Sequence, residues 1–332
     1  PPRKRLVTAR RTRVRRHRVA LVAAALALTT ILTLMSCSAA DTPPAAQPVH
    51  EAIIVSTGGR MAVTRTTTEG SGNTWTNGDK IVLVVKNFKN NTGGTETTTE
   101  HTYQAAAGAG ATLSPVDLAN TNFWRSTGET KEITGAWSFG TSNAPTLTSN
   151  TITSYTLATA QDGNGELLYS PGEEKSYNAD PATRAFSLTF YHQLAKVIFN
   201  VKSDGLNPGI TAATMSIPGS GTFSTPDTGG HNATWSFGEN ASITPKTETT
   251  AADCIATYSA VVIPGDYSGK TLLQLATSKG TYSYIPASTQ TLSPGMCYTF
   301  TITIKNQIVL NTVTVTPWTD DATNSQTFTF AD

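Results

Sequence analysis

Apolar residues in this chain fall in short runs separated by turn residues, and in the second half the runs recur about every ten residues. Residues 81–85 are apolar on both faces, which predicts a central, fully buried strand. Residues 195–201 form a second strong run, and residues 299–304 alternate between polar and apolar, as in a strand with one wet face. The Pro-Gly, Ser-Lys-Gly and Ser-Pro-Gly turns between later runs are typical of an antiparallel β-sandwich.

Weaker patterns of the same kind occur elsewhere. They predict strands at residues 51–56, 151–157, 185–191, 258–263, 271–276, 281–285, 309–315 and 326–330. The middle of the chain is expected to be rich in loops, and residues 115–120 are the one short candidate helix. Thr, Ser, Gly and Asn are abundant, and the branched β-carbon of Thr suits a pleated surface. The pattern therefore predicts an all-β fold.

The first 37 residues have the layout of an export signal. Nine Lys and Arg residues lie between Arg3 and Arg18, and an apolar run then extends from residue 19 to residue 35. The run ends in Leu34-Met35-Ser36-Cys37, which resembles a bacterial lipobox. In that pattern the Cys37 thiol is acylated and anchors the mature chain to a membrane. The alternative is a single transmembrane helix, for which this run is at the short limit.

Removal of residues 1–36 changes the charge of the protein. The full chain has 24 basic and 23 acidic residues, and the part from Cys37 onward retains 15 and 23, a net charge of −8. Such a chain lacks the positive surface that neutralises phosphates, so we expect no nucleic-acid partner. Residues 37–50 are rich in Pro and Ala and form a predicted tether between the anchor and the folded part.

The chemistry of enzymes is sparse in this sequence. We find no nucleophile elbow, no His-Glu-x-x-His, no Walker loop and no Cys-x-x-Cys, and we expect no catalysis, cofactor or metal site. Cys254 and Cys297 either form a disulfide, which export permits, or remain buried free thiols. His192 is interpreted as a hydrogen-bonding residue near a domain junction. The five tryptophans suit either a sugar-binding platform or sandwich cores.

Several motifs occur in an order that resembles a known family. They are the lipobox at Cys37, Trp75-x-x-Gly78-Asp79-Lys80-Ile81, His192-Gln193-Leu194-Ala195-Lys196-Val197, Leu292-Ser293-Pro294-Gly295-Met296-Cys297-Tyr298 and Val313-Thr314-Val315-Thr316-Pro317-Trp318. Together they resemble the Bacteroidetes fimbrillins, especially the Mfa-like group, in which Lys is found where this chain has Met296. The resemblance implies two transthyretin-like sandwich domains, of residues 51–190 and 191–332, with Greek-key connections.

The resemblance also implies a function. Fimbrillins are subunits of type V pili that reach the outer membrane as lipoproteins, where an arginine-specific protease removes the first strand. A strand of another subunit then fills the vacated position, and the assembled fimbria stands on the cell surface. In this sequence the removable strand is residues 51–56, and the candidate cleavage sites are Arg65 and, second, Arg60. Residues 326–330 suit either a donated strand or an ordinary last strand. The alternative function is a surface glycan-binding lipoprotein.

Overall fold

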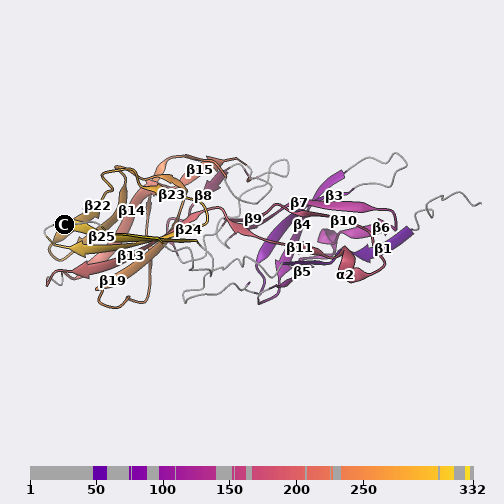
Figure 1. Ribbon diagram of the computed structural model, residues 1–332, viewed down its shortest axis with the longest axis horizontal. Coiled ribbons are helices and arrows are strands. Elements are labelled where there is room, and N and C mark those ends of the chain that lie inside the picture. The colour runs from indigo at the N-terminus through magenta and orange to yellow at the C-terminus, as the bar shows by residue number, and fades with distance from the viewer. Residues whose placement is uncertain are drawn as a thin grey trace, which may run out of the picture. The chain divides into compact units, whose positions relative to one another are not determined.

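The computed structural model describes residues 48–57, 75, 77–87, 97–108, 110–139, 152, 154–161, 167–205, 208–224, 226, 233–305, 307–317 and 326–329 (Figure 1). These residues form an all-β chain of mostly antiparallel sheets, which confirms the predicted fold class. In the same residues, no helix has the length and apolar character needed to cross a membrane. Residues 46–332 cluster as one compact unit. The domain boundary between residues 190 and 191 therefore stays a prediction.

The first half of the chain forms a nine-stranded sheet. Its strands, in hydrogen-bonding order, are β11 (Phe186–Leu188), β2 (Val55–Thr57), β5 (Thr112–Pro115), β4 (Thr97–Ala105), β3 (Lys80–Asn87), β7 (Thr130–Phe139), β9 (Leu167–Ser170) and β12 (Tyr191–His192), and β10 (Glu173–Ser176) also pairs with β7. A separate two-stranded sheet joins β1 (Pro48–Ala52) to β6 (Phe123–Ser126). Two short helical turns, η1 (Leu118–Asn120) and α2 (Pro181–Arg184), lie among these strands.

The described residues form four further sheets. The six-stranded sheet contains β18 (Lys246–Thr247), β19 (Ala256–Val262), β13 (Ala195–Ser203), β24 (Met296–Ile304), β25 (Ile308–Pro317) and β26 (Gln326–Thr329). The four-stranded sheet contains β17 (Asn240–Ile243), β14 (Ile210–Pro218), β21 (Thr271–Thr277) and β22 (Gly280–Tyr284). The smaller sheets are β16 (Trp235–Phe237), β15 (Ser220–Phe223) and β8 (Ser154–Thr156), and β20 (Gly265–Asp266) with β23 (Thr291–Leu292).

Alternation along the strands builds the core of the second half. In β13 every second residue from Ala195 to Val201 is buried, and the residues between them are partly exposed. Strands β13, β24 and β25 lie side by side (Figure 1), and Phe199 of β13 stacks on Phe300 of β24 with ring centroids 5.2 Å apart. Tyr284 of the four-stranded sheet reaches the same Phe300 at 5.7 Å. The six- and four-stranded sheets therefore share one apolar interior, as in a sandwich.

A second core lies under the nine-stranded sheet. It includes Phe186 from β11, at one end of the strand order, and Leu168 from β9, near the other end. Trp124 of β6 is fully buried in this core and lies parallel to Phe186, with ring centroids 6.3 Å apart. Since residues from both ends of the order share one interior, the sheet folds over its own core and β6 closes it.

Three local expectations need correction. The middle of the chain contains the long strands β4 and β7, which the pattern missed because Thr-rich and charged residues interrupt their apolar positions. The expected helix at residues 115–120 is only the single turn η1. The expected strand at residues 51–56 is two strands, β1 and β2, because its ladder changes partners at Ile53 and Ile54. The Ile53 N–H donates to the Asn122 carbonyl, and the Ile54 carbonyl accepts from the Phe186 N–H.

Candidate functional site: the first strand segment

Residues 48–57, called here the first strand segment, run through two sheets and present one apolar edge to the core. Ile53 and Val55 are buried, Val49 packs against the same core, and Val55 is 0% exposed. The alternate residues point outward, and Ile54 is 40% exposed. A period of two is the pattern of a strand that fills a slot from one side.

The segment is held by main-chain hydrogen bonds on both sides. In β2, Val55 pairs in parallel with Phe186 of β11 and antiparallel with Leu113 of β5. The Thr57 N–H donates to the Ala111 carbonyl over 2.9 Å. Residues 48–52 pair antiparallel with β6. Removal of the segment would therefore leave β11 and β5 with unpaired N–H and C=O groups around an apolar groove, which is a template for a new strand.

One charged residue of the segment is also tied to the core. Glu51 accepts a hydrogen bond from Arg184 Nη2, and its other oxygen accepts from Tyr177 Oη over 3.1 Å. Arg184 is only 5% exposed, and its guanidinium lies 4.9 Å from the centre of the Tyr177 ring. A buried guanidinium needs an anionic or carbonyl partner, because an unpaired buried charge is costly.

Local sequence explains how Arg184 is positioned. Asp180 caps α2 by accepting from the Ala182 N–H over 3.0 Å, and Pro181 occupies the first helical position, where its fixed φ angle is favourable. Arg184 then ends the helix, and its Nη1 donates to the Asn178 carbonyl over 2.6 Å. The turn therefore aims the guanidinium at Glu51. Nothing in the sequence pattern predicted this pair, whose members are 133 residues apart.

Comparison with known proteins identifies the family. A family model described as fimbrillin-like matches residues 64–318. The chain belongs to the fimbrillin-like family. The matched region begins after the first strand segment. No curated protein matches the chain.

This fimbrillin-like chain has the same fold as solved structures of other proteins. A candidate cell adhesion protein from Bacteroides uniformis is 18% identical, with a TM-score of 0.55, and the match covers 81% of this chain and 98% of that one. A candidate cell adhesion protein from Bacteroides ovatus is also 18% identical, with a TM-score of 0.51 and coverage of 82% and 98%. At this identity, the likeness shows the fold.

The predicted lipidation and cleavage sites of the fimbrillin-like chain, Cys37, Arg60 and Arg65, lie outside the described residues. Their roles stay predictions. Among the described residues no group of His, Cys, Asp and Glu could hold a metal ion. Of the four described tryptophans, Trp75, Trp124 and Trp137 are buried, and Trp235 packs against the core shared by the six- and four-stranded sheets. These side chains fill cores and do not form an exposed sugar-binding platform.

The two inner cysteines are free thiols on segments that neighbour β13, and they lie beside opposite ends of that strand. Cys297 pairs with Lys196, whereas Cys254 precedes Ile255, whose N–H donates to the Val201 carbonyl over 2.7 Å. Five residues of strand separate these positions by about 16 Å. A disulfide requires Cα atoms within about 7 Å, so the geometry favours the free-thiol alternative.

We expect both thiols to be alkylated, and at different rates. Burial raises the pKa of Cys297, so its thiolate fraction at neutral pH is small. Cys254 lies in a turn and should react first. Timed iodoacetamide labelling of the native, non-reduced protein, followed by peptide mass spectrometry, measures both rates. A linked pair of peptides containing Cys254 and Cys297 would contradict the structure.

His192 of β12 is buried, and its pKa is lowered to about 3, first by desolvation and then by nearby Lys196. Its folded pKa lies below the unfolded value of 6.5, so the unfolded chain binds more protons between these values. We expect the free energy of unfolding to fall by up to about 1.4 kcal/mol per pH unit as pH drops through this window. Urea unfolding at several pH values measures it. His192→Gln should flatten the profile, and His50→Gln, at an exposed histidine, should not.

Proposed function

We propose that this chain is a structural or adhesive subunit of a fimbria, without catalytic activity. Family membership supports the fimbrial role. The observation that carries the mechanism is the first strand segment, which fills a slot between β11 and β5 with two buried apolar side chains and ladders on both sides. Such a segment can be exchanged for a strand of another subunit without unfolding the core.

The proposed sequence of events begins with export as a lipoprotein acylated at Cys37. At the outer membrane, a maturation protease cuts after Arg65 or Arg60 and frees the first strand segment. A strand from another subunit then occupies the slot, and the subunit becomes part of a surface fimbria. In the described residues, β26 pairs with β25 of its own sheet, which suits an ordinary last strand. Use of this strand as a donor stays open to test.

The experiment is treatment of the purified precursor with an arginine-specific protease, followed by electron microscopy. The wild-type chain should form filaments. The double variant Arg60→Ala plus Arg65→Ala should stay a folded monomer, because the first strand segment remains covalently attached. Arg60→Lys plus Arg65→Lys keeps the charge and should behave like the alanine variant. Filaments of normal length from either double variant would contradict the cleavage mechanism.

A further inference from the structure

The core under the nine-stranded sheet encloses a polar cluster that the proposed function does not use. We call Asn87, Glu129 and Lys131 the buried amine–amide cluster. Lys131 is 0% exposed, Glu129 is 4% exposed and Asn87 is 5% exposed. Asn87 and Lys131 are direct partners in the antiparallel register of β3 and β7, so their side chains leave the sheet on the same face.

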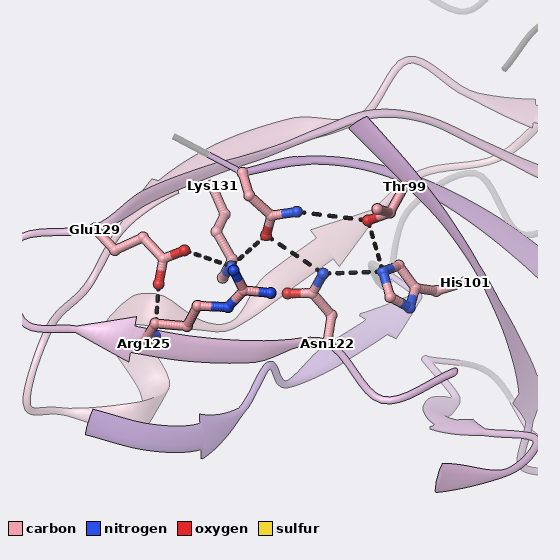
Figure 2. A network of polar contacts seen from close by, with 7 residues as sticks. Thr99, His101, Asn122, Arg125, Glu129 and Lys131 are labelled. Carbon is pink, nitrogen blue, oxygen red and sulfur yellow. Dashed lines mark hydrogen bonds and ion pairs between the residues drawn. The ribbon is translucent and has the colours of Figure 1, made fainter. Parts of the chain in front are cut away.

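Lys131 connects the three side chains by donating hydrogen bonds to the other two. Lys131 Nζ donates to Asn87 Oδ1 and, over 2.7 Å, to Glu129 Oε1 (Figure 2). The second oxygen of Glu129 accepts from the Arg125 N–H over 2.6 Å, which fixes the carboxylate beside the amine. The Trp124 ring lies 5.6 Å from Nζ and excludes water on that side.

This arrangement prepares the amine for reaction. Burial lowers the pKa of Lys131, although its hydrogen bond to Glu129 acts in the opposite direction. In a dry site the ammonium and the carboxylate both lose hydration, so transfer of a proton from Lys131 to Glu129 gives a neutral pair at reduced cost. A neutral amine is a nucleophile, and the carboxamide of Asn87, whose oxygen accepts a hydrogen bond from Lys131 Nζ, offers an electrophilic carbon beside it.

Polar groups contact both the oxygen and the nitrogen of the Asn87 carboxamide and suit such an attack. Asn122 Nδ2 donates to Asn87 Oδ1 over 3.4 Å and would stabilise negative charge that develops on this oxygen. On the other side, Asn87 Nδ2 donates to Thr99 Oγ1 over 3.5 Å, and Thr99 contacts His101 Nε2 at 2.8 Å (Figure 2). Thr99 is exposed, so this side gives the leaving nitrogen a path to solvent.

We propose that Lys131 and Asn87 form an intramolecular isopeptide bond that joins β7 to β3, with Glu129 as the proton carrier. Lys131 Nζ forms a bond to Asn87 Cγ, and the bond from Cγ to Nδ2 breaks. The Lys131 ammonium loses two protons, one of them through Glu129, and the leaving NH2 group takes up both and departs as ammonium. Glu129 returns to its carboxylate form, and no other reactant is needed.

The test is a tryptic digest of the full chain after denaturation. A cross-linked chain should yield a branched peptide, in which residues 87–89 are joined to residues 126–175, because acylated Lys131 resists trypsin. Its mass should be lower than the sum of its parts by one ammonia, about 17 Da. Separate linear peptides 87–89, 126–131 and 132–175 from the wild-type protein would overturn the proposal. Fragment sequencing is needed, since Asn164-Gly165 in the peptide of residues 126–175 can also lose ammonia by cyclisation.

Matched variants test the roles of individual groups. Lys131→Arg retains the charge and the tryptic site but lacks the nucleophile, and the branched peptide should disappear. Lys86→Arg, on the neighbouring pair of the same ladder, should leave it at the wild-type yield. Glu129→Gln preserves size and should lower the yield at least tenfold. If Lys131→Arg fails to fold by circular dichroism, the wild-type digest and Glu129→Gln still decide. A wild-type yield in Glu129→Gln would overturn the role of Glu129.

Discussion

Replacement of Val55 by aspartate should destabilise the unprocessed chain by about 4 kcal/mol or more, because it places an unpaired carboxylate in a fully buried position. The slot between β11 and β5 offers main-chain hydrogen bonds to the backbone of residue 55 but a core to its side chain. Urea unfolding of the precursor measures the loss.

The neighbouring residue provides the control for this prediction. Ile54→Asp makes the same chemical change one position along the strand, where the side chain is 40% exposed, and should alter the free energy of unfolding by less than about 0.5 kcal/mol. Equal losses at both positions would show that the first strand segment does not sit in the slot with this register. Under the proposed mechanism, Val55→Asp loses its effect once the segment has been replaced by another strand.

Reversal of the charge at Arg184 should also have a large effect. In Arg184→Glu, a buried carboxylate faces Glu51 in place of the guanidinium, and we expect a loss of about 3 kcal/mol in the free energy of unfolding. The first strand segment is then repelled where it was held, so the variant should also release the segment more readily. Limited proteolysis of residues 48–57 reports that release.

A charge swap separates this pair from general damage to the core. The double variant Arg184→Glu plus Glu51→Arg restores opposite charges, and it should recover at least half of the loss of the single variant. Glu174→Arg reverses a carboxylate that is exposed on β10 and should leave stability nearly unchanged. No recovery in the double variant would mean that Glu51 and Arg184 do not stabilise the segment through their contact.

The sequence predicted the strands whose burial can be recognised from the local pattern of apolar and polar residues. Residues 81–85 are the centre of β3, and the expected strands at 258–263, 271–276 and 309–315 correspond to β19, β21 and β25 within two residues. It failed for β7, because Lys131 lies at a fully buried position that an alternation rule assigns to solvent. The burial of Lys131 can be explained only when its hydrogen-bond partners, Asn87 and Glu129, are known.

The candidate site was predicted in part for the same reason. Residues 51–56 were predicted to be a strand from a short apolar run, and the structure buries Ile53 and Val55. That the strand is removable came from the resemblance to fimbrillins and stays a prediction. The change of ladder partner at Ile53 and Ile54 depends on β6, β11 and β5, which are far away in sequence. The Glu51–Arg184 pair likewise depends on how α2 is placed by tertiary structure.

The division of the first strand segment between two sheets has a kinetic consequence. Residues 48–52 pair only with β6 in the described residues, and they carry exposed side chains such as His50 and Ala52, whereas Val55 is fully buried. An invading strand could therefore pair with β6 first, before the buried residues of β2 have been displaced. The β1 and β2 ladders can open one after the other, so at no stage are all the hydrogen-bonding groups of the slot left unpaired. The barrier of the exchange is then set by the loss of the Glu51–Arg184 contact and by the buried β2 half, and a change at Val55 would slow or speed the exchange more than a change at Ala52.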